Sequence, residues 1–119
     1  MIGYIEWTSK KTQQVERANV TRCITNGGVY HLEFSNSELC SEGGISLGYG
    51  TEKQQTTGTY MFTDRLYRGE ANVVGNITSS KDLISFEGAW HDLKDETGAW
   101  DVYIEFERPH MITLTTPEH

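Results

Sequence analysis

The chain consists of 119 residues, 36% of them hydrophobic and 11% aromatic, which suits one compact domain and is too rich in aromatic rings for a disordered chain. Seventeen acidic against ten basic side chains give a formal net charge of −7, which repels phosphate backbones and argues against nucleic-acid binding. No apolar run reaches the roughly 20 residues that a membrane-spanning helix needs, and residues 1–7 lack the basic and apolar regions of a signal peptide. The composition predicts a cytoplasmic protein without nucleic-acid or membrane partners.

Apolar and polar residues alternate with a period of two along most of the chain, and helical periodicity is almost absent. Asn26-Gly27-Gly28 is a strong hairpin signal, because these residues accept positive φ at little cost. Arg68-Gly69 is expected to form another turn. The expected strands, in chain order, cover residues 2–8, 16–25, 29–35, 45–49, 58–67 and 71–77, followed by the two strands of a hairpin within 83–107.

The stretch FEGAWHDLKDETGAWDVYIEFE, residues 86–107, is interpreted as that hairpin, although it contains Gly-Ala-Trp twice. Placing Trp90 opposite Trp100 aligns apolar residues on one face of both strands and gathers acids on the other. A slip of one residue would bring acids to the core, so the register is well specified. Gly88 is then expected inside a strand, where it either allows a bend or gives room to a bulky neighbour. The predicted core-side pairs are Trp90–Trp100, Gly88–Val102, Phe86–Ile104 and Ile84–Phe106.

Eight short strands joined by turns predict an all-β domain, an antiparallel up-and-down barrel, with a two-sheet β-sandwich as the alternative. The barrel domain is expected to cover residues 1–110, and residues 111–119 to form a tail or a short extra strand. The chain is similar in length and aromatic content to the avidin and lipocalin-like barrels. It has Gly3-x-x-x-Trp7 where lipocalins have an early Gly-x-Trp, so the similarity implies architecture alone.

Cofactor and metal sites are not predicted. Cys23 and Cys40 could form one disulfide, but we expect free thiols in a reducing compartment. His31 with Glu33, and the acidic segment 91–96, could each contribute ligands to a cation. The spacing in segment 91–96 does not match an EF-hand loop, and nothing identifies a third ligand for His31 and Glu33. An exposed strand face and a solvated acidic turn are therefore the preferred explanations.

The principal functional hypothesis is a non-enzymatic barrel that binds a small, partly apolar ligand in its interior. Arg22 lies at period two between Val20 and Ile24, so it is expected to point inward and to require an internal acid or an anionic ligand. Aromatic side chains would form the walls. The predicted ligand-binding residues are Arg22, Tyr30, Tyr49, Tyr60, Phe62, Trp90 and Trp100.

A second hypothesis is a protein-binding or inhibitor module that presents the acidic outer face of the 83–107 hairpin to a basic protein. Its expected contact residues are Glu87, Asp101, Tyr103, Glu105 and Glu107. An enzyme is the third alternative, for which no catalytic residues are predicted. An incomplete barrel could also form a homodimer through its sheet edges.

Overall fold

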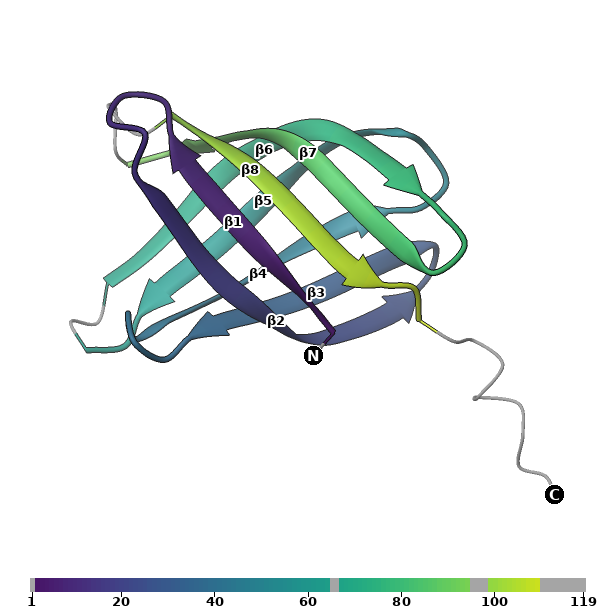
Figure 1. Ribbon diagram of the computed structural model, residues 1–119, viewed down its shortest axis with the longest axis horizontal. Coiled ribbons are helices and arrows are strands. Elements are labelled where there is room, and N and C mark those ends of the chain that lie inside the picture. The colour runs from purple at the N-terminus through teal and green to yellow at the C-terminus, as the bar shows by residue number, and fades with distance from the viewer. Residues whose placement is uncertain (1, 65–66, 95–98, 110–119) are drawn as a thin grey trace, which may run out of the picture.

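The computed structural model describes residues 2–64, 67–94 and 99–109. These residues form an all-β barrel in which each strand pairs antiparallel with the next and the last pairs with the first (Figure 1). The described strands are β1 (Gly3–Ser9), β2 (Val15–Asn26), β3 (Val29–Asn36), β4 (Ser41–Gly48), β5 (Lys53–Phe62), β6 (Tyr67–Ser79), β7 (Leu83–Asp92) and β8 (Ala99–Glu107).

Closure of the barrel confirms the predicted up-and-down fold and excludes the sandwich. β1 pairs with β8 along its whole length, from Gly3 opposite Phe106 to Ser9 opposite Trp100. The described strands therefore leave no sheet edge free for the edge-to-edge homodimer. Residues 111–119, predicted to be a tail or extra strand, lie outside the described residues. No helix in the described ranges is long and apolar enough to cross a membrane.

The register of the β7–β8 hairpin is the one predicted. Trp90 pairs with Trp100 and Phe86 with Ile104, and the acidic partners Asp101 and Glu105 lie on the other face. Across its other edge, β7 places Gly88 directly opposite Gly75 of β6. The neighbour of Gly88 is therefore the β6 backbone and not a bulky side chain.

The predicted end of the fifth strand and the predicted turn at Arg68-Gly69 need correction. The fifth strand ends at Phe62, and Arg68-Gly69 is no turn but part of β6. Gly69 points into the barrel, where a Cβ would lie 2.2 Å from the ring of Tyr60. Gly69 thus makes room for the ring of Tyr60. An interpretation of the sequence that assigns glycines to turns does not consider such a role.

The predicted inward orientation of Arg22 is wrong because β2 contains an irregularity. The pairing of β2 with β3 shifts between Val20 and Arg22, which indicates a β-bulge at Thr21. Ala18 and Val20 point inward before the bulge, and Cys23 does so after it. Arg22 is exposed on the outer surface.

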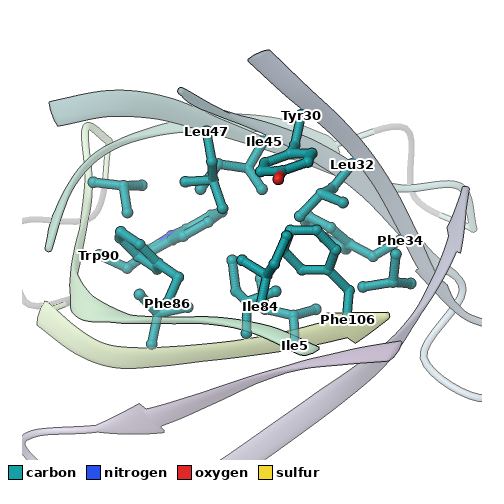
Figure 2. Packing of buried hydrophobic residues seen from close by; sticks show 14 of the residues in the cluster. Ile5, Tyr30, Leu32, Phe34, Ile45, Leu47, Ile84, Phe86, Trp90 and Phe106 are labelled. Carbon is teal, nitrogen blue, oxygen red and sulfur yellow. The ribbon is translucent and has the colours of Figure 1, made fainter. Parts of the chain in front are cut away.

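The middle of the barrel is filled by side chains from both walls. Figure 2 shows Ile84, Phe86 and Phe106 facing Ile45 and Leu47 across the interior. The largest fully buried side chains are Phe86, Phe106, Ile5, Leu47, Ile84, Ile104 and Val73. These buried side chains occupy the interior at this level of the barrel.

The end of the barrel at which β2, β4 and β6 end is closed by polar and aromatic groups. Gln54 is only 8% exposed, and its side-chain amide satisfies the β4–β5 turn. It accepts a hydrogen bond from the Gly48 amide at 2.9 Å and donates to the carbonyl oxygens of Gly48 and Thr51 at 2.6 and 2.8 Å. Tyr30, near the start of β3 at the same end, is buried, and Tyr49, 45% exposed, lies with its ring centroid 4.6 Å from that of Tyr30.

The two cysteines are free, as expected. Cys23 points inward near the end of β2, whereas Cys40 lies in the β3–β4 turn at the opposite end of the barrel. Burial raises the pKa of the Cys23 thiol.

The paired glycines of β6 and β7 give a first prediction. A Cβ on Gly88 would lie 2.2 Å from the Val74 carbonyl oxygen and 2.9 Å from Cα of Gly75, so Gly88→Ala requires a backbone shift. We expect a loss of about 1–3 kcal/mol in the free energy of unfolding, measured with urea. Gly50→Ala is the matched control, because nothing lies within 4 Å of its Cβ position. Equal stability of the two variants would contradict the close approach of β6 and β7.

Candidate functional site: an aromatic pocket at one end of the barrel

The barrel interior is hollow at the end where β1, β3, β5 and β7 end, on the left of Figure 1. The cavity there has a volume of about 160 Å³. We call it the aromatic pocket; it is lined by Trp7, Glu16, Phe34, Ser41, Tyr60, Trp90, Asp92 and Trp100. All three tryptophans of the chain thus meet at this end.

The up-and-down topology brings these residues together from distant parts of the sequence. Each described strand except β6 contributes a side chain near its end at the mouth of the pocket. The inward position of β6 at this level is Gly69, over which the ring of Tyr60 lies. Trp7 pairs with Glu16 across β1 and β2, and Trp90 pairs with Trp100 across β7 and β8.

Glycines in the wall explain why the aromatic rings leave a space. Cβ atoms on Gly43, Gly58 and Gly69 would lie 2.6, 2.4 and 2.2 Å from the rings of Phe34, Trp90 and Tyr60, respectively. These rings therefore lie against bare backbone. Rings displaced toward the wall in this way do not fill the barrel axis.

The rings meet edge to face, which is a favourable arrangement for aromatic pairs. The centroid of Trp7 is 5.5 Å from that of Trp90, at an interplanar angle of 85°, and 5.3 Å from that of Phe34, at 66°. Tyr60 lies on the other side of Trp90, at 6.4 Å. Trp90 is only 3% exposed, so it forms the centre of the aromatic wall.

Two carboxyl groups and two hydroxyl groups accompany the rings. The Tyr60 hydroxyl donates a hydrogen bond to Oδ2 of Asp92, and the backbone amide of Lys94 donates to Oδ1 at 2.9 Å. The side-chain amide of Gln14 donates to Oε2 of Glu16 at 3.3 Å. Asp92 on β7 is thus held by two hydrogen bonds, and Glu16 on β2 accepts one longer hydrogen bond from an exposed side chain.

The predicted ligand-binding residues are divided between three places. Tyr60, Trp90 and Trp100 line the aromatic pocket. Phe62 does not line it but packs with its ring centroid 5.8 Å from that of Tyr60. Tyr30 and Tyr49 lie at the opposite end, beyond the filled middle layer, and Arg22 is outside. The single interior cavity predicted from the sequence is therefore a smaller pocket at one end.

Sequence reasoning missed Trp7, Glu16, Phe34, Ser41 and Asp92. Trp7 is in phase with the buried Ile5 at period two, and Asp92 is in phase with Trp90, so alternation alone could have placed both inward. Asp92 was instead assigned to the hairpin loop, because the acidic run that follows hides the end of β7. Glu16 and Ser41 carry no apolar signal.

A wider, open hollow of about 1040 Å³ extends over the outer surface of β3 to β6. Acidic and basic side chains, among them Glu33, Glu42, Arg68 and Lys94, are mixed along its rim. Apolar side chains contribute to its lining as well, and two of them, Phe34 and Tyr60, also line the aromatic pocket.

The alternative cation ligands are not gathered in the structure. No group of three or more His, Cys, Asp or Glu side chains that could hold a metal occurs within residues 2–64, 67–94 and 99–109. His31 is exposed, with Nδ1 2.9 Å from the Ser46 hydroxyl. His91 is exposed, whereas Asp92 lines the pocket. Asp95 and Glu96 lie outside the described residues.

The acidic outer face contains the residues predicted for it. Glu87, Asp101 and Glu107 are exposed, while Tyr103 and Glu105 are half-buried and joined by a hydrogen bond from the Tyr103 hydroxyl to Oε1 of Glu105, at 2.9 Å. Basic side chains border the face. Lys10 lies 3.5 Å from Asp101, and the Arg17 guanidinium lies 3.9 Å from the ring centroid of Tyr4, which packs next to Tyr103.

The outer face gives a pH-dependent prediction. Burial, and then the hydrogen bond to Glu105, raise the pKa of Tyr103. The folded state therefore favours the protonated phenol, and this contribution to stability is present below the ordinary tyrosine pKa of about 10 and is lost as the pH rises through the folded-state value. We expect Tyr103→Phe to remove a late component from the ultraviolet phenolate titration and to lose less stability than the parent above about pH 10.

Burial also raises the pKa of Tyr30, so a late component remains in Tyr103→Phe. A difference spectrum between parent and variant that develops wholly below the ordinary tyrosine pKa would contradict the assignment.

Comparison of the chain with protein-family models, with curated proteins and with solved structures found no match. The residues of the aromatic pocket and of the outer face are thus the only basis for a functional proposal.

Proposed function

We propose that the protein is a small-molecule-binding barrel that takes a small, partly apolar ligand into the aromatic pocket. The observation that carries this proposal is a hollow of about 160 Å³ lined by five aromatic rings in a barrel whose middle layer is otherwise filled. A cavity of about 150 Å³ is large enough for a benzene-sized molecule. Drug-sized ligands need about 300 Å³ or more, so the pocket suits a small ligand or one end of a larger one.

The chemistry of the lining supports binding more than catalysis. Apolar walls with a few fixed polar groups are typical of ligand sites, in which the polar groups orient the ligand. Here the oriented groups are Asp92, held by Tyr60 and by the Lys94 amide, and Glu16, held by Gln14. A reducing compartment such as the cytoplasm is part of this proposal, because two free thiols persist there.

Filling the pocket tests the proposal. Ser41 lines the pocket, so Ser41→Phe places a ring in the space that the ligand would occupy. We expect at least one member of a panel of benzene-sized neutral, anionic and cationic compounds to raise the thermal midpoint of the parent protein. Ser41→Phe should abolish the shift, while the exposed Ser37→Phe in the neighbouring turn should retain it. A panel that shifts no midpoint, or shifts that survive in Ser41→Phe, would overturn the proposal.

A second candidate function uses the acidic outer face to bind a basic protein. Glu87, Asp101 and Glu107 are exposed together around the half-buried Tyr103, which fits an aromatic anchor within a charged rim.

A lysine-rich peptide is a suitable probe for this face. We expect the double variant Glu105→Gln, Glu107→Gln to bind the peptide about tenfold more weakly than the parent at low salt. The control, Glu42→Gln with Glu52→Gln, removes the same charge from another region. An equal loss in the control would show that net charge alone attracts the peptide.

A further inference from the structure

The charges that line the aromatic pocket have one sign. Two carboxyl groups, Glu16 and Asp92, contribute to the lining, and no lysine, arginine or histidine does so among the described residues. An anionic ligand would be repelled by both carboxylates and would find no basic side chain among the described lining residues. A neutral ligand would not compensate the charge of either carboxylate. A cation is the only ligand class whose charge the described lining complements.

The aromatic walls favour the same charge. The face of an aromatic ring carries partial negative charge and attracts cations, most strongly in tryptophan. Trp7 stands nearly perpendicular to Trp90, at 85°, in an edge-to-face contact, and both indoles line the pocket. Tyr60 and Trp100 complete the enclosure. Rings around a carboxylate pair form an environment in which a partly desolvated positive charge is stabilised from several sides.

The carboxyl groups are oriented before any ligand arrives. Asp92 receives hydrogen bonds from the Tyr60 hydroxyl and from the Lys94 amide, and Glu16 receives one from Gln14. A ligand therefore does not have to order these side chains, which reduces the entropic cost of binding. Tyr60 contributes twice, because its ring forms part of the wall while its hydroxyl fixes Asp92.

Size and shape narrow the class of cation. A metal ion requires several oxygen, nitrogen or sulfur ligands close together, whereas five of the eight lining residues are aromatic and no such group of ligands occurs among the described residues. A primary ammonium is strongly hydrated and would have to give up that water at apolar walls. An alkylated ammonium presents methyl groups to the rings and spreads its charge over them. The volume of about 160 Å³ is that of a single such group.

We propose that the aromatic pocket binds the alkylammonium group of a small organic cation, with Trp7, Trp90, Trp100 and Tyr60 as the walls and Glu16 and Asp92 as the counter-charges. This inference rests on the proposed small-molecule function and specifies its ligand class.

Choline and 3,3-dimethyl-1-butanol are the probes that test it, because they share one shape and differ in the charge of the central atom. We expect choline to quench or shift the tryptophan fluorescence in a saturable manner, and the neutral alcohol to bind at least about tenfold more weakly. Isothermal titration calorimetry provides the independent measurement. The parent protein, Ser41→Phe and Ser37→Phe are titrated in parallel.

Glu16→Gln tests the counter-charge, since it keeps the shape of the side chain and removes its charge. We expect it to weaken choline binding about tenfold and to leave binding of the neutral alcohol unchanged. Glu87→Gln on the outer face is the matched control and should bind choline as the parent does. Circular dichroism of each variant verifies the fold.

The possible results separate the two proposals. Equal affinities for choline and the alcohol, or equal effects of Glu16→Gln on both, would overturn the cation assignment and leave a neutral-ligand pocket. Binding of neutral or anionic panel compounds without choline, sensitive to Ser41→Phe, would do the same. If neither choline nor any panel compound binds in a manner sensitive to Ser41→Phe, the small-molecule function itself is wrong.

Discussion

The pairing of β1 with β8 is the constraint on which the rest of the molecule depends. It converts a meander of hairpins into a closed barrel and fixes which residues of β1 point inward. Because side chains alternate along a strand, a slip of one residue at this seam would turn Ile5 and Trp7 outward together. Closure therefore decides both the filled middle and the position of the first tryptophan at the hollow end.

The contrast between the filled middle and the hollow end arises from where the glycines stand. In the middle, branched and aromatic side chains from opposite walls meet at the axis. At the pocket, Gly43, Gly58 and Gly69 allow three rings to lie against the backbone of β4, β5 and β6. Large side chains thus leave more free volume here than smaller ones do a few residues away. In a barrel without such a pocket, the same glycines would only reduce stability, since glycine in a strand interior weakens the strand.

The sequence was sufficient for the fold because alternation and turn residues agree over most of the chain. The β7–β8 register was also predictable, since acids on one face and apolar residues on the other allow only one alignment. Arg22 was misplaced because a bulge at Thr21 changes the phase of β2, and nothing in Val20-Thr21-Arg22 marks it. Gly69 was assigned to a turn because a glycine that makes room for a distant ring looks the same in sequence as a glycine in a loop.

The pocket itself was only partly predictable. The two tryptophans of the hairpin were predicted correctly as lining residues. Tyr30 and Tyr49 were predicted with them but lie at the other end, because an inward orientation does not specify the position of a side chain along the barrel axis. The position of a side chain along the barrel axis is set by the register of the strands and by their tilt in the closed barrel, both of which involve residues far apart in sequence. Alternation could have placed Asp92 inward, but its proximity to Glu16 could not be predicted, since only the closed barrel brings β2 and β7 to one cavity.

The filled end of the barrel would affect how a ligand is recognised if the proposed function is correct. The fully buried side chains of the middle layer lie between the pocket and the far end of the barrel, where the Gln54 side chain bonds the β4–β5 turn. A ligand that enters through the open end would place its leading group in the pocket. The rest of the molecule would remain at the rim. If the pocket binds a ligand as proposed, selectivity would be strict for the group inside the pocket and loose for the part of the ligand that remains outside it.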